Sequence, residues 1–496
     1  MSKKRIIKAS KILSSKELER ICFVLIAIFF VFAVLRIWVH PSGGHTHRQS
    51  DTIGMSISFA EQVRERGWDA LDFLIYPRVL QRGLLDGINA SEFPLLNVVC
   101  GFGFLLSSNP WVGVFLSSLM ILALNLYVAF VYLPKLLRAW NVEVSSSVCL
   151  LIWFAGGTLA GQSNVVMPEG IAFPMMILGA VQLLEVNQRL SRFALGILLC
   201  SLGIATKPTV ILVLGAVVAL PLLVHERRTQ WKSLLTGCTL SLLFPSWWYV
   251  IHAKKILNIA QGPQIFALAG FHPLEKLQEV GFKNILWLMW REPQQGQFPM
   301  FFGWFFIAAA IALGEWVPVV LYLLSLIVAV SLDGAHIYAH YYYFIGTSIF
   351  SILLMARILG AAQDRGGYLK TLIVILLGWG VVYNVRSNIW VWGVDYRHGQ
   401  AMWNLGAQAR KIINPSDHLI TDDDMYPYKM LLMGRSGTAA NSHVYQICNR
   451  PQFAERPLAI VSETPPPEVP PLCSGRPHEF KSIEINSSKW YVTLIR

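Results

Sequence analysis

Charged residues are scarce in this chain. Only 14% of its 496 residues are charged, whereas 54% are hydrophobic. A soluble domain of this length needs more polar surface than that. Long apolar runs recur along the sequence and approach the ~20 residues that are needed to cross the hydrocarbon core of a bilayer. The composition therefore excludes a soluble globular protein and predicts an α-helical polytopic membrane protein.

Acidic residues are fewer than basic ones. The chain has 29 Asp and Glu against 41 Lys and Arg, so its formal net charge is +12. A basic excess of this size can indicate nucleic-acid binding. Here, however, the Lys and Arg residues lie mostly between the apolar runs. This placement indicates membrane topology and contact with lipid phosphates, and we expect no nucleic acid as a partner.

Cysteines are also few, 7 in all, and no two have the spacing of metal ligands. Most lie in or near apolar runs, where a small buried side chain is the ordinary interpretation; these are Cys22, Cys100, Cys149, Cys200 and Cys238. Cys448 and Cys473 stand alone in the polar C-terminal region. If that region is outside the cytoplasm, a disulfide between them is one of two open alternatives.

Hydropathy predicts about eleven spans. They lie near residues 21–39, 111–133, 143–162, 170–186, 194–206, 208–224, 233–251, 299–313, 316–332, 341–358 and 370–388. The first run follows a basic segment and precedes no small-residue cleavage site, so we interpret it as a retained span with the N-terminus in the cytoplasm.

Four of the five turns after the even-numbered spans are basic, and the fifth, Gly314-Glu315-Trp316, is too short to test the positive-inside rule. The basic turns carry Lys135 and Arg138; Arg189 and Arg192; Arg227, Arg228 and Lys232; and Arg357, Arg365 and Lys370. Basic residues gather on the cytoplasmic side of membrane proteins, and an odd number of spans then places the C-terminus outside. We therefore expect a multi-pass protein of the bacterial inner (cytoplasmic) membrane, with its C-terminus in the periplasm.

Most of the sequence outside the membrane is predicted on the outer side. A transmembrane domain, residues 1–388, contains a first outer loop at 40–110 and a second at 252–298. Residues 389–496 form a small α/β domain, since three short apolar runs predict strands and one segment predicts a helix. The strands are expected at 418–421, 458–461 and 490–494, and the helix at 401–413.

Residues 51–66 predict an amphipathic helix that is suited to lie on the membrane surface. Asp51 opens this helix just outside the first span, and as a bare pattern it is an ordinary N-terminal cap. Three residues that can carry positive charge, His45, His47 and Arg48, precede it in the sequence. Those neighbours favour a reactive carboxylate instead.

Glu92 stands at the start of a second short apolar segment, 93–107, which we interpret as a helix in the outer interface. An acidic residue at this position is favoured by the helix dipole alone. The alternative is a second acidic group on the same membrane face as Asp51.

Five motifs occur along the chain in an order that resembles membrane glycosyltransferases of the GT-C fold, similar to bacterial aminoarabinose transferases of lipid A and to protein O-mannosyltransferases. The motifs are Arg48-Gln49-Ser50-Asp51-Thr52, Glu92-Phe93-Pro94-Leu95, Met167-Pro168-Glu169, Thr206-Lys207-Pro208 and His340-Tyr341-Tyr342-Tyr343. The resemblance covers most of the chain up to the C-terminal domain.

The resemblance implies a donor sugar linked to a polyprenyl phosphate, and attack at its anomeric carbon on the outer face. It implies that Asp51 is the catalytic carboxylate of the first loop and Glu92 a second acidic residue of the site. Phe93 and Gly54 stand where lipid A-modifying members carry basic residues. These departures argue against aminoarabinose transfer to lipid A, and a glycan, a lipid or a protein stays open as the acceptor.

Transfer with inversion needs a base at the acceptor hydroxyl, a role that a partly desolvated Asp51 suits. The leaving lipid phosphate needs partners that strengthen as charge develops. The candidates are Arg48, Lys207, Arg291, His340, Tyr341 and Tyr342. Lys207, before Pro208, can also be a lysine that snorkels to the surface. Arg291, beside Glu292, can also be one half of a surface ion pair.

We assign no cofactor firmly. His45 and His47, with the two carboxylates, form a ligand set for a divalent cation, which is the alternative to a metal-free site. Two other functions compete with the transferase. A polysaccharide polymerase or ligase would use arginines in large loops rather than an acid directly after the first span. A transporter would show paired repeats and ionisable residues near the bilayer midplane, and the chain has no internal repeat.

Overall fold

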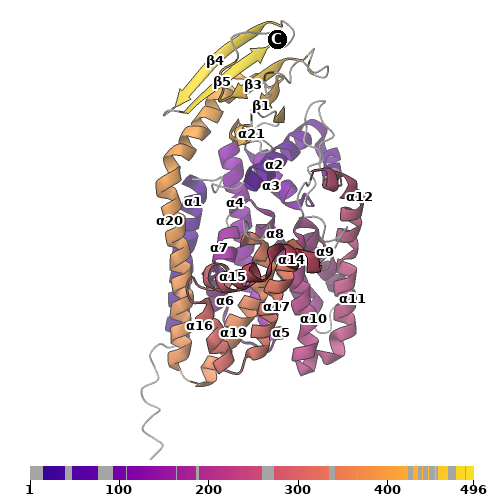
Figure 1. The fold of residues 1–496 in the computed structure, drawn as a ribbon, viewed down its shortest axis with the longest axis vertical. Helices are drawn as coiled ribbons and strands as arrows, with labels where there is room; N and C mark the ends of the chain where they lie inside the picture. Colours follow the sequence, from indigo (N-terminus) through magenta and orange to yellow (C-terminus); the bar gives the residue numbers. More distant parts are fainter. Residues whose placement is uncertain are drawn as a thin grey trace, which may run out of the picture.

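The computed structural model of the chain is mostly helical, with a small sheet at one end of a helical bundle (Figure 1). It describes residues 15–39, 47–75, 93–107, 109–163, 165–185, 189–259, 273–333, 341–365, 367–422, 428–433, 438–439, 456–466, 476–485 and 488–496, and the single residues 445 and 453. The cysteine pair of the C-terminal region, Cys448 and Cys473, lies outside these residues.

The helices of the first half are α1 (Ser15–Val39), α2 (His47–Arg66), η2 (Gly67–Leu74), α3 (Leu95–Leu106), α4 (Pro110–Tyr127), η3 (Val128–Tyr132), α5 (Leu133–Ala139), α6 (Ser146–Ala155), α7 (Gly157–Gln162), α8 (Pro168–Leu184), α9 (Leu190–Thr206), η4 (Pro208–Ile211), α10 (Leu212–Leu223), η5 (His225–Gln230), α11 (Trp231–Ser241) and α12 (Leu243–Ile259). Those of the second half are α14 (Pro273–Val280), α15 (Phe282–Glu292), η7 (Pro293–Gln297), α16 (Gly303–Ala312), α17 (Trp316–Asp333), η8 (Tyr341–Thr347), α19 (Ser348–Arg365), α20 (Gly367–Ile412) and α21 (Tyr428–Met433).

Proline marks where several of these helices begin. Pro110 and Pro168 occupy the first positions of α4 and α8, where their missing N–H leaves no bond unmade. The side chain of Asn109 caps α4 by accepting a hydrogen bond from the Trp111 N–H at 3.0 Å. Pro208 ends α9 and opens η4, so the chain bends sharply at Lys207.

Every apolar run that the hydropathy singled out falls on helix. Four stretches of the described residues are long and apolar enough to cross a membrane: Pro110–Ala139, Arg227–His252, Tyr343–Ala362 and Tyr368–Val385. The remaining apolar helices, such as Ser146–Ala155 and Gly303–Ala312, are shorter. The predicted count of eleven spans is therefore not confirmed, although membrane-spanning helices are.

Two arginines of the basic turns form hydrogen bonds to carbonyl groups at the ends of other helices. Arg227, between α10 and α11, donates a hydrogen bond to the Leu184 carbonyl at the end of α8. Arg357 pairs with Glu315 at 2.9 Å and reaches the Trp140 carbonyl beyond α5. The turn between α10 and α11 lies at the end of the bundle that is away from the sheet (Figure 1).

The sheet has the strand order β2-β1-β3-β5-β4. Its strands are β1 (His418–Thr421), β2 (Thr438–Ala439), β3 (Leu458–Ser462), β4 (His478–Ile485) and β5 (Ser488–Ile495). β1 runs parallel to β2 and β3, whereas β5 runs antiparallel to β3 and β4. The three predicted strands are present, and they are the buried ones. β4 was missed because it is an exposed edge strand with little apolar pattern.

The helix predicted at 401–413 is the end of a much longer one. α20 has 46 residues and crosses the predicted domain boundary at 388/389 without a break. It runs along the side of the bundle next to α1 and ends beneath the sheet (Figure 1). The predicted domain boundary thus falls inside a continuous helix.

α2 buries its apolar arc against protein, together with part of its polar arc, although Glu65 at its end is exposed. Ile53, Ile57 and Ala60 pack with α3, and on the polar arc Ser58 and Gln62 are buried as well. α2 lies between α3 and α21, directly below the sheet (Figure 1). The prediction of a surface helix was wrong because the periodicity of a sequence shows which face is apolar, not what covers it.

Candidate functional site

α2 and α3 run parallel, with the second turn of α2 beside the first turn of α3. The Asn97 side chain donates a hydrogen bond to the Thr52 carbonyl at 2.9 Å, and one turn further on Gly101 lies against Phe59. A Cβ at Gly101 would stand 2.4 Å from the Phe59 ring, so the close approach of the two helices requires glycine there. The residue after Asp51 is thus bonded to the first turn of α3.

A buried ion pair joins α8 to the end of α9. Lys207 Nζ lies 2.8 Å from Glu169 Oε1, and the two side chains are 1% and 0% exposed. The Lys207 ammonium also lies over the Tyr343 ring of η8, 4.1 Å from its centroid. A charged pair without solvent needs such additional partners to offset its desolvation.

The last residues of α9 hold the start of α3. The Ala205 carbonyl accepts one hydrogen bond from the Phe93 N–H at 3.0 Å and another from the Tyr249 hydroxyl at 2.9 Å. The Phe93 ring packs edge-on against Phe244 and Trp248 of α12. Phe93, which replaces the basic residue of the family motif, is therefore an apolar anchor between α9 and α12.

Polar atoms near this junction lack hydrogen-bond partners among the described residues. They are Glu169 Oε2, Thr206 Oγ1 and Thr209 Oγ1, all buried. Gly346 of η8 lies so close to the Thr209 carbonyl that a Cβ there would come within 2.0 Å of it. η8 therefore packs tightly against η4 at Gly346 and Thr209.

A second charged pair lies at the end of α15. Arg291 donates to Glu292 Oε1, with Nε at 3.0 Å, and stacks on the Trp287 ring. The pair is mostly buried, at 14% and 2% exposure, rather than on the surface. Burial raises the pKa of Glu292 to about 7, although Arg291 opposes the shift.

The same segment reaches η8 through Gln297. Its amide nitrogen donates to the Phe344 carbonyl at 3.2 Å, and its oxygen accepts from the Ser348 hydroxyl at 2.9 Å. Lys207 and Arg291 therefore belong to two networks that share η8. Each has its charge taken by a carboxylate in this structure, so their predicted contact with a donor phosphate stays a prediction.

The other predicted residues are placed only in part. α2 begins at His47, so the prediction that Asp51 opens this helix was wrong, and Asp51 lies in its second turn. His47 and Arg48 are in the first turn, and Tyr341 and Tyr342 open η8, but none of these side chains is described. Glu92, His45 and His340 lie outside the described residues. The Asp51–Glu92 separation is accordingly a prediction still. In the part of the chain that the structure describes, no group of His, Cys, Asp and Glu could hold a metal ion.

Glu169 is the residue that sequence reasoning missed as part of the site. It appeared there only as the third letter of Met167-Pro168-Glu169. One signal was available: an acidic residue in the first turn of an apolar helix, and a lysine at another helix break, both expected inside a membrane bundle. Two opposite charges in apolar surroundings are expected to find each other.

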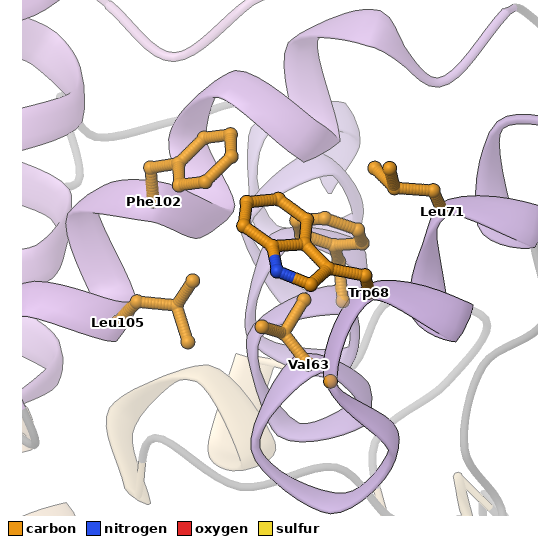
Figure 2. A pocket seen from close by; sticks show the side chains of 7 residues that line it. Val63, Trp68, Leu71, Phe102 and Leu105 are labelled. Carbon is orange, nitrogen blue, oxygen red and sulfur yellow. The ribbon is translucent and has the colours of Figure 1, made fainter.

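An apolar pocket opens at the far end of the α2–α3 pair. Its volume is about 330 Å³, and it is lined by Phe59, Val63, Gly67, Trp68, Leu71, Phe102 and Leu105. Trp68 of η2 is 78% exposed, and its ring lies between the side chains of Phe102 and Leu71 (Figure 2). Its lining has no charged or polar side chain, so the pocket is no site for the chemistry of a sugar phosphate.

The fold has known counterparts. The crystal structure of ArnT from Cupriavidus metallidurans bound to undecaprenyl phosphate matches 95% of this chain and 97% of its own, with a TM-score of 0.53 and 10% sequence identity. The chain has the GT-C fold. Apo ArnT from the same organism matches with a TM-score of 0.47, 12% identity and coverage of 95% and 97%.

An oligosaccharyltransferase from Archaeoglobus fulgidus, in complex with Zn and sulfate, matches 88% of this chain and 68% of its own, with a TM-score of 0.43 and 10% identity. No protein-family model and no curated protein matches the sequence. The GT-C fold that the five motifs predicted is thus confirmed by the course of the backbone and not by sequence similarity.

Proposed function

We propose that this protein is a glycosyltransferase that moves a sugar from a polyprenyl-phosphate donor to an acceptor on the outer face of the bacterial cytoplasmic membrane. The observation that carries the proposal is the parallel pairing of α2 and α3, in which Asn97 is bonded to Thr52. The pairing supports the proposal because it sets the turn of α2 that contains Asp51 beside the first turn of α3, the helix that follows Glu92 in the sequence. A GT-C fold over nearly the whole chain, shared with a protein solved with undecaprenyl phosphate, supports it.

Asp51 acts in this proposal as the general base. It takes the proton of the acceptor hydroxyl while the hydroxyl oxygen attacks the anomeric carbon and the lipid phosphate leaves on the opposite side, which inverts the configuration. Glu92 is the second acid of the site. Cationic and hydroxyl groups stabilise the charge that grows on the leaving phosphate. We keep Arg48, Lys207, Arg291, His340, Tyr341 and Tyr342 as candidates for that role.

The outer face is proposed from the two ends of the bundle. The turn that holds Arg227 lies at one end, and the sheet, with α2 and α3 below it, lies at the other (Figure 1). Basic turns favour the cytoplasm, so residues 389–496 and the site belong to the periplasmic side. A reporter that works only in the periplasm, fused after Arg496, is expected to be active, whereas activity of a cytoplasm-only reporter would reverse the topology.

Two measurements test the function. The purified protein should bind undecaprenyl phosphate and should not bind undecaprenol, which has the same chain without the phosphate. Mass spectrometry of envelope glycans, lipids and proteins should then show a sugar modification in cells with the wild-type gene and none in cells with Asp51→Asn. Equal affinity for the two lipids, together with identical envelopes, would rule the proposal out. The modified fraction would also identify the acceptor and the sugar.

A further inference from the structure

The segment from Ala205 to Lys207, at the end of α9, contacts four other parts of the chain. Glu169 of α8 and Tyr343 of η8 contact the Lys207 side chain. The Phe93 N–H and the Tyr249 hydroxyl bond to the Ala205 carbonyl, which links α3 and α12 to the end of α9. All four partners are separated from the segment by more than 30 residues of sequence, so the junction is a tertiary feature that local structure does not dictate.

Lys207 is the pivot of this junction. It ends α9 in an extended conformation, with φ −151° and ψ 104°, because Pro208 follows it. Its own carbonyl accepts from the Val210 N–H at 3.2 Å, and its N–H donates to the Gly203 carbonyl at 2.9 Å. Both backbone groups of Lys207 thus bond to residues near it in sequence. Its ammonium, by contrast, pairs with Glu169 of α8, so the position of that carboxylate bears on the direction in which the chain leaves α9.

We infer that Glu169 is a positioning residue: through Lys207 it fixes the end of α9, whose Ala205 carbonyl holds Phe93 and so sets the start of α3 against the start of α2. The inference rests on the proposed function, because it concerns the placement of the acids of that site. Three contacts carry this effect: Glu169 Oε1 with Lys207 Nζ, the Ala205 carbonyl with the Phe93 N–H, and the Asn97 side chain with the Thr52 carbonyl. Short stretches of backbone, at the end of α9 and at the start of α3, link each contact to the next.

An ion pair suits this task better than an apolar contact would. Two apolar side chains of similar volume often replace a buried ion pair without loss of stability. An apolar contact is not directional, however, whereas the pair and its cation–π contact with Tyr343 set both the distance and the orientation of the lysine. A buried pair kept at the junction is thus understandable as a device for orientation.

The test compares Glu169→Gln with Glu185→Gln. Glu185 follows the same helix and pairs with Arg192 at the surface, so it is a matched control in which a carboxylate loses an exposed partner. Hydrogen exchange of the Phe93 amide, followed by mass spectrometry, is the first readout. We expect it to speed up about tenfold or more in Glu169→Gln, because its acceptor at Ala205 is no longer held in place, and to stay unchanged in Glu185→Gln.

A double variant, Glu169→Leu with Lys207→Met, separates orientation from mere packing. We expect its melting midpoint to return toward that of the wild type, while the Phe93 amide stays fast and sugar transfer stays at least about tenfold low, since small misplacements of reacting groups are costly. Recovery of slow exchange in the double variant, or unchanged exchange in Glu169→Gln, would overturn the inference.

The exchange readout needs no substrate. If the wild-type protein failed to bind undecaprenyl phosphate and transferred no sugar, the proposed function would fail, yet slow exchange at Phe93 that depends on Glu169 would still establish the positioning contact. If binding and transfer were present and exchange did not respond to Glu169, only the positioning role would be lost.

Discussion

The two buried charged pairs, Glu169 with Lys207 and Arg291 with Glu292, are chemically alike but structurally different. Glu169 and Lys207 come from different helices and are almost fully buried, and they join α8 to the end of α9. Arg291 and Glu292 are neighbours in sequence, so their pairing joins no two elements. The first pair therefore holds two helices together, whereas in the second a buried carboxylate is neutralised by the residue next to it in sequence. A charge inside a membrane bundle does not by itself mark a reaction site.

Neither pair supplies the proposed base, and the largest effect is expected elsewhere. Asp51→Asn keeps the size of the side chain at the start of α2 and removes its basicity. Loss of a general base slows a reaction by about 10²–10⁴-fold. We expect sugar transfer by the purified protein to fall by that factor while the affinity for undecaprenyl phosphate and the melting midpoint hold. Wild-type turnover in this variant would assign the base to another residue.

Removal of the cation should separate the two pairs by stability. Lys207→Met leaves Glu169 buried without its partner, a change that typically costs about 3–5 kcal/mol of unfolding free energy. Arg291→Met should cost clearly less, because Glu292, whose pKa is already raised to about 7, can take up a proton instead. The midpoint of thermal unfolding in one detergent compares the two variants directly. Equal losses would show that the long-range pair has no special structural weight.

The local pair should also be sensitive to pH. Burial raises the pKa of Glu292 from 4.5 to about 7, so the folded state binds its proton more tightly than the unfolded state does. The stabilisation by this proton is fully present below about pH 4.5 and is lost as the pH rises through 7.

Glu292→Gln, which is neutral at every pH, should therefore flatten the fall of the melting midpoint between pH 5 and 8. Glu315→Gln is a suitable control, since Glu315 pairs with Arg357 and no comparable burial surrounds it. An unchanged pH profile in Glu292→Gln would mean that other groups cause the fall.

Sequence patterns predicted the elements of this fold better than their junctions. The runs at 418–421 and 458–461 are β1 and β3, and each predicted span lies on helix, because apolar runs are a local signal. Long-range pairing is not local. Nothing in Met167-Pro168-Glu169 shows that Glu169 meets Lys207, and nothing in residues 51–66 shows that α21 and the sheet cover α2.

The candidate site was predictable to a similar extent. The order of motifs anticipated the GT-C fold, whereas a common position for Asp51 and Glu92 stays a prediction. The position of Phe93 misled in one respect: it looked like a missing phosphate contact and is a packing anchor against Trp248. Phe93 thus shows that a different side chain at a motif position can take a packing role there.

The smallest effect is expected for an exposed pair, which completes the scale. Arg66 and Asp72 lie 2.8 Å apart in the segment that follows α2, with side chains 42% and 53% exposed. Water and salt screen such a pair, and the fixed side chains lose entropy that offsets most of the attraction. Asp72→Asn should leave the melting midpoint within the error of the measurement, and the small remaining difference should vanish at high salt.

The effect of Lys207→Met should persist at high salt, because salt does not reach a side chain that is 1% exposed. If Asp72→Asn destabilised the protein as much as Lys207→Met does, burial would not be what distinguishes the pairs, and the structural weight given to Glu169 and Lys207 would have to be withdrawn.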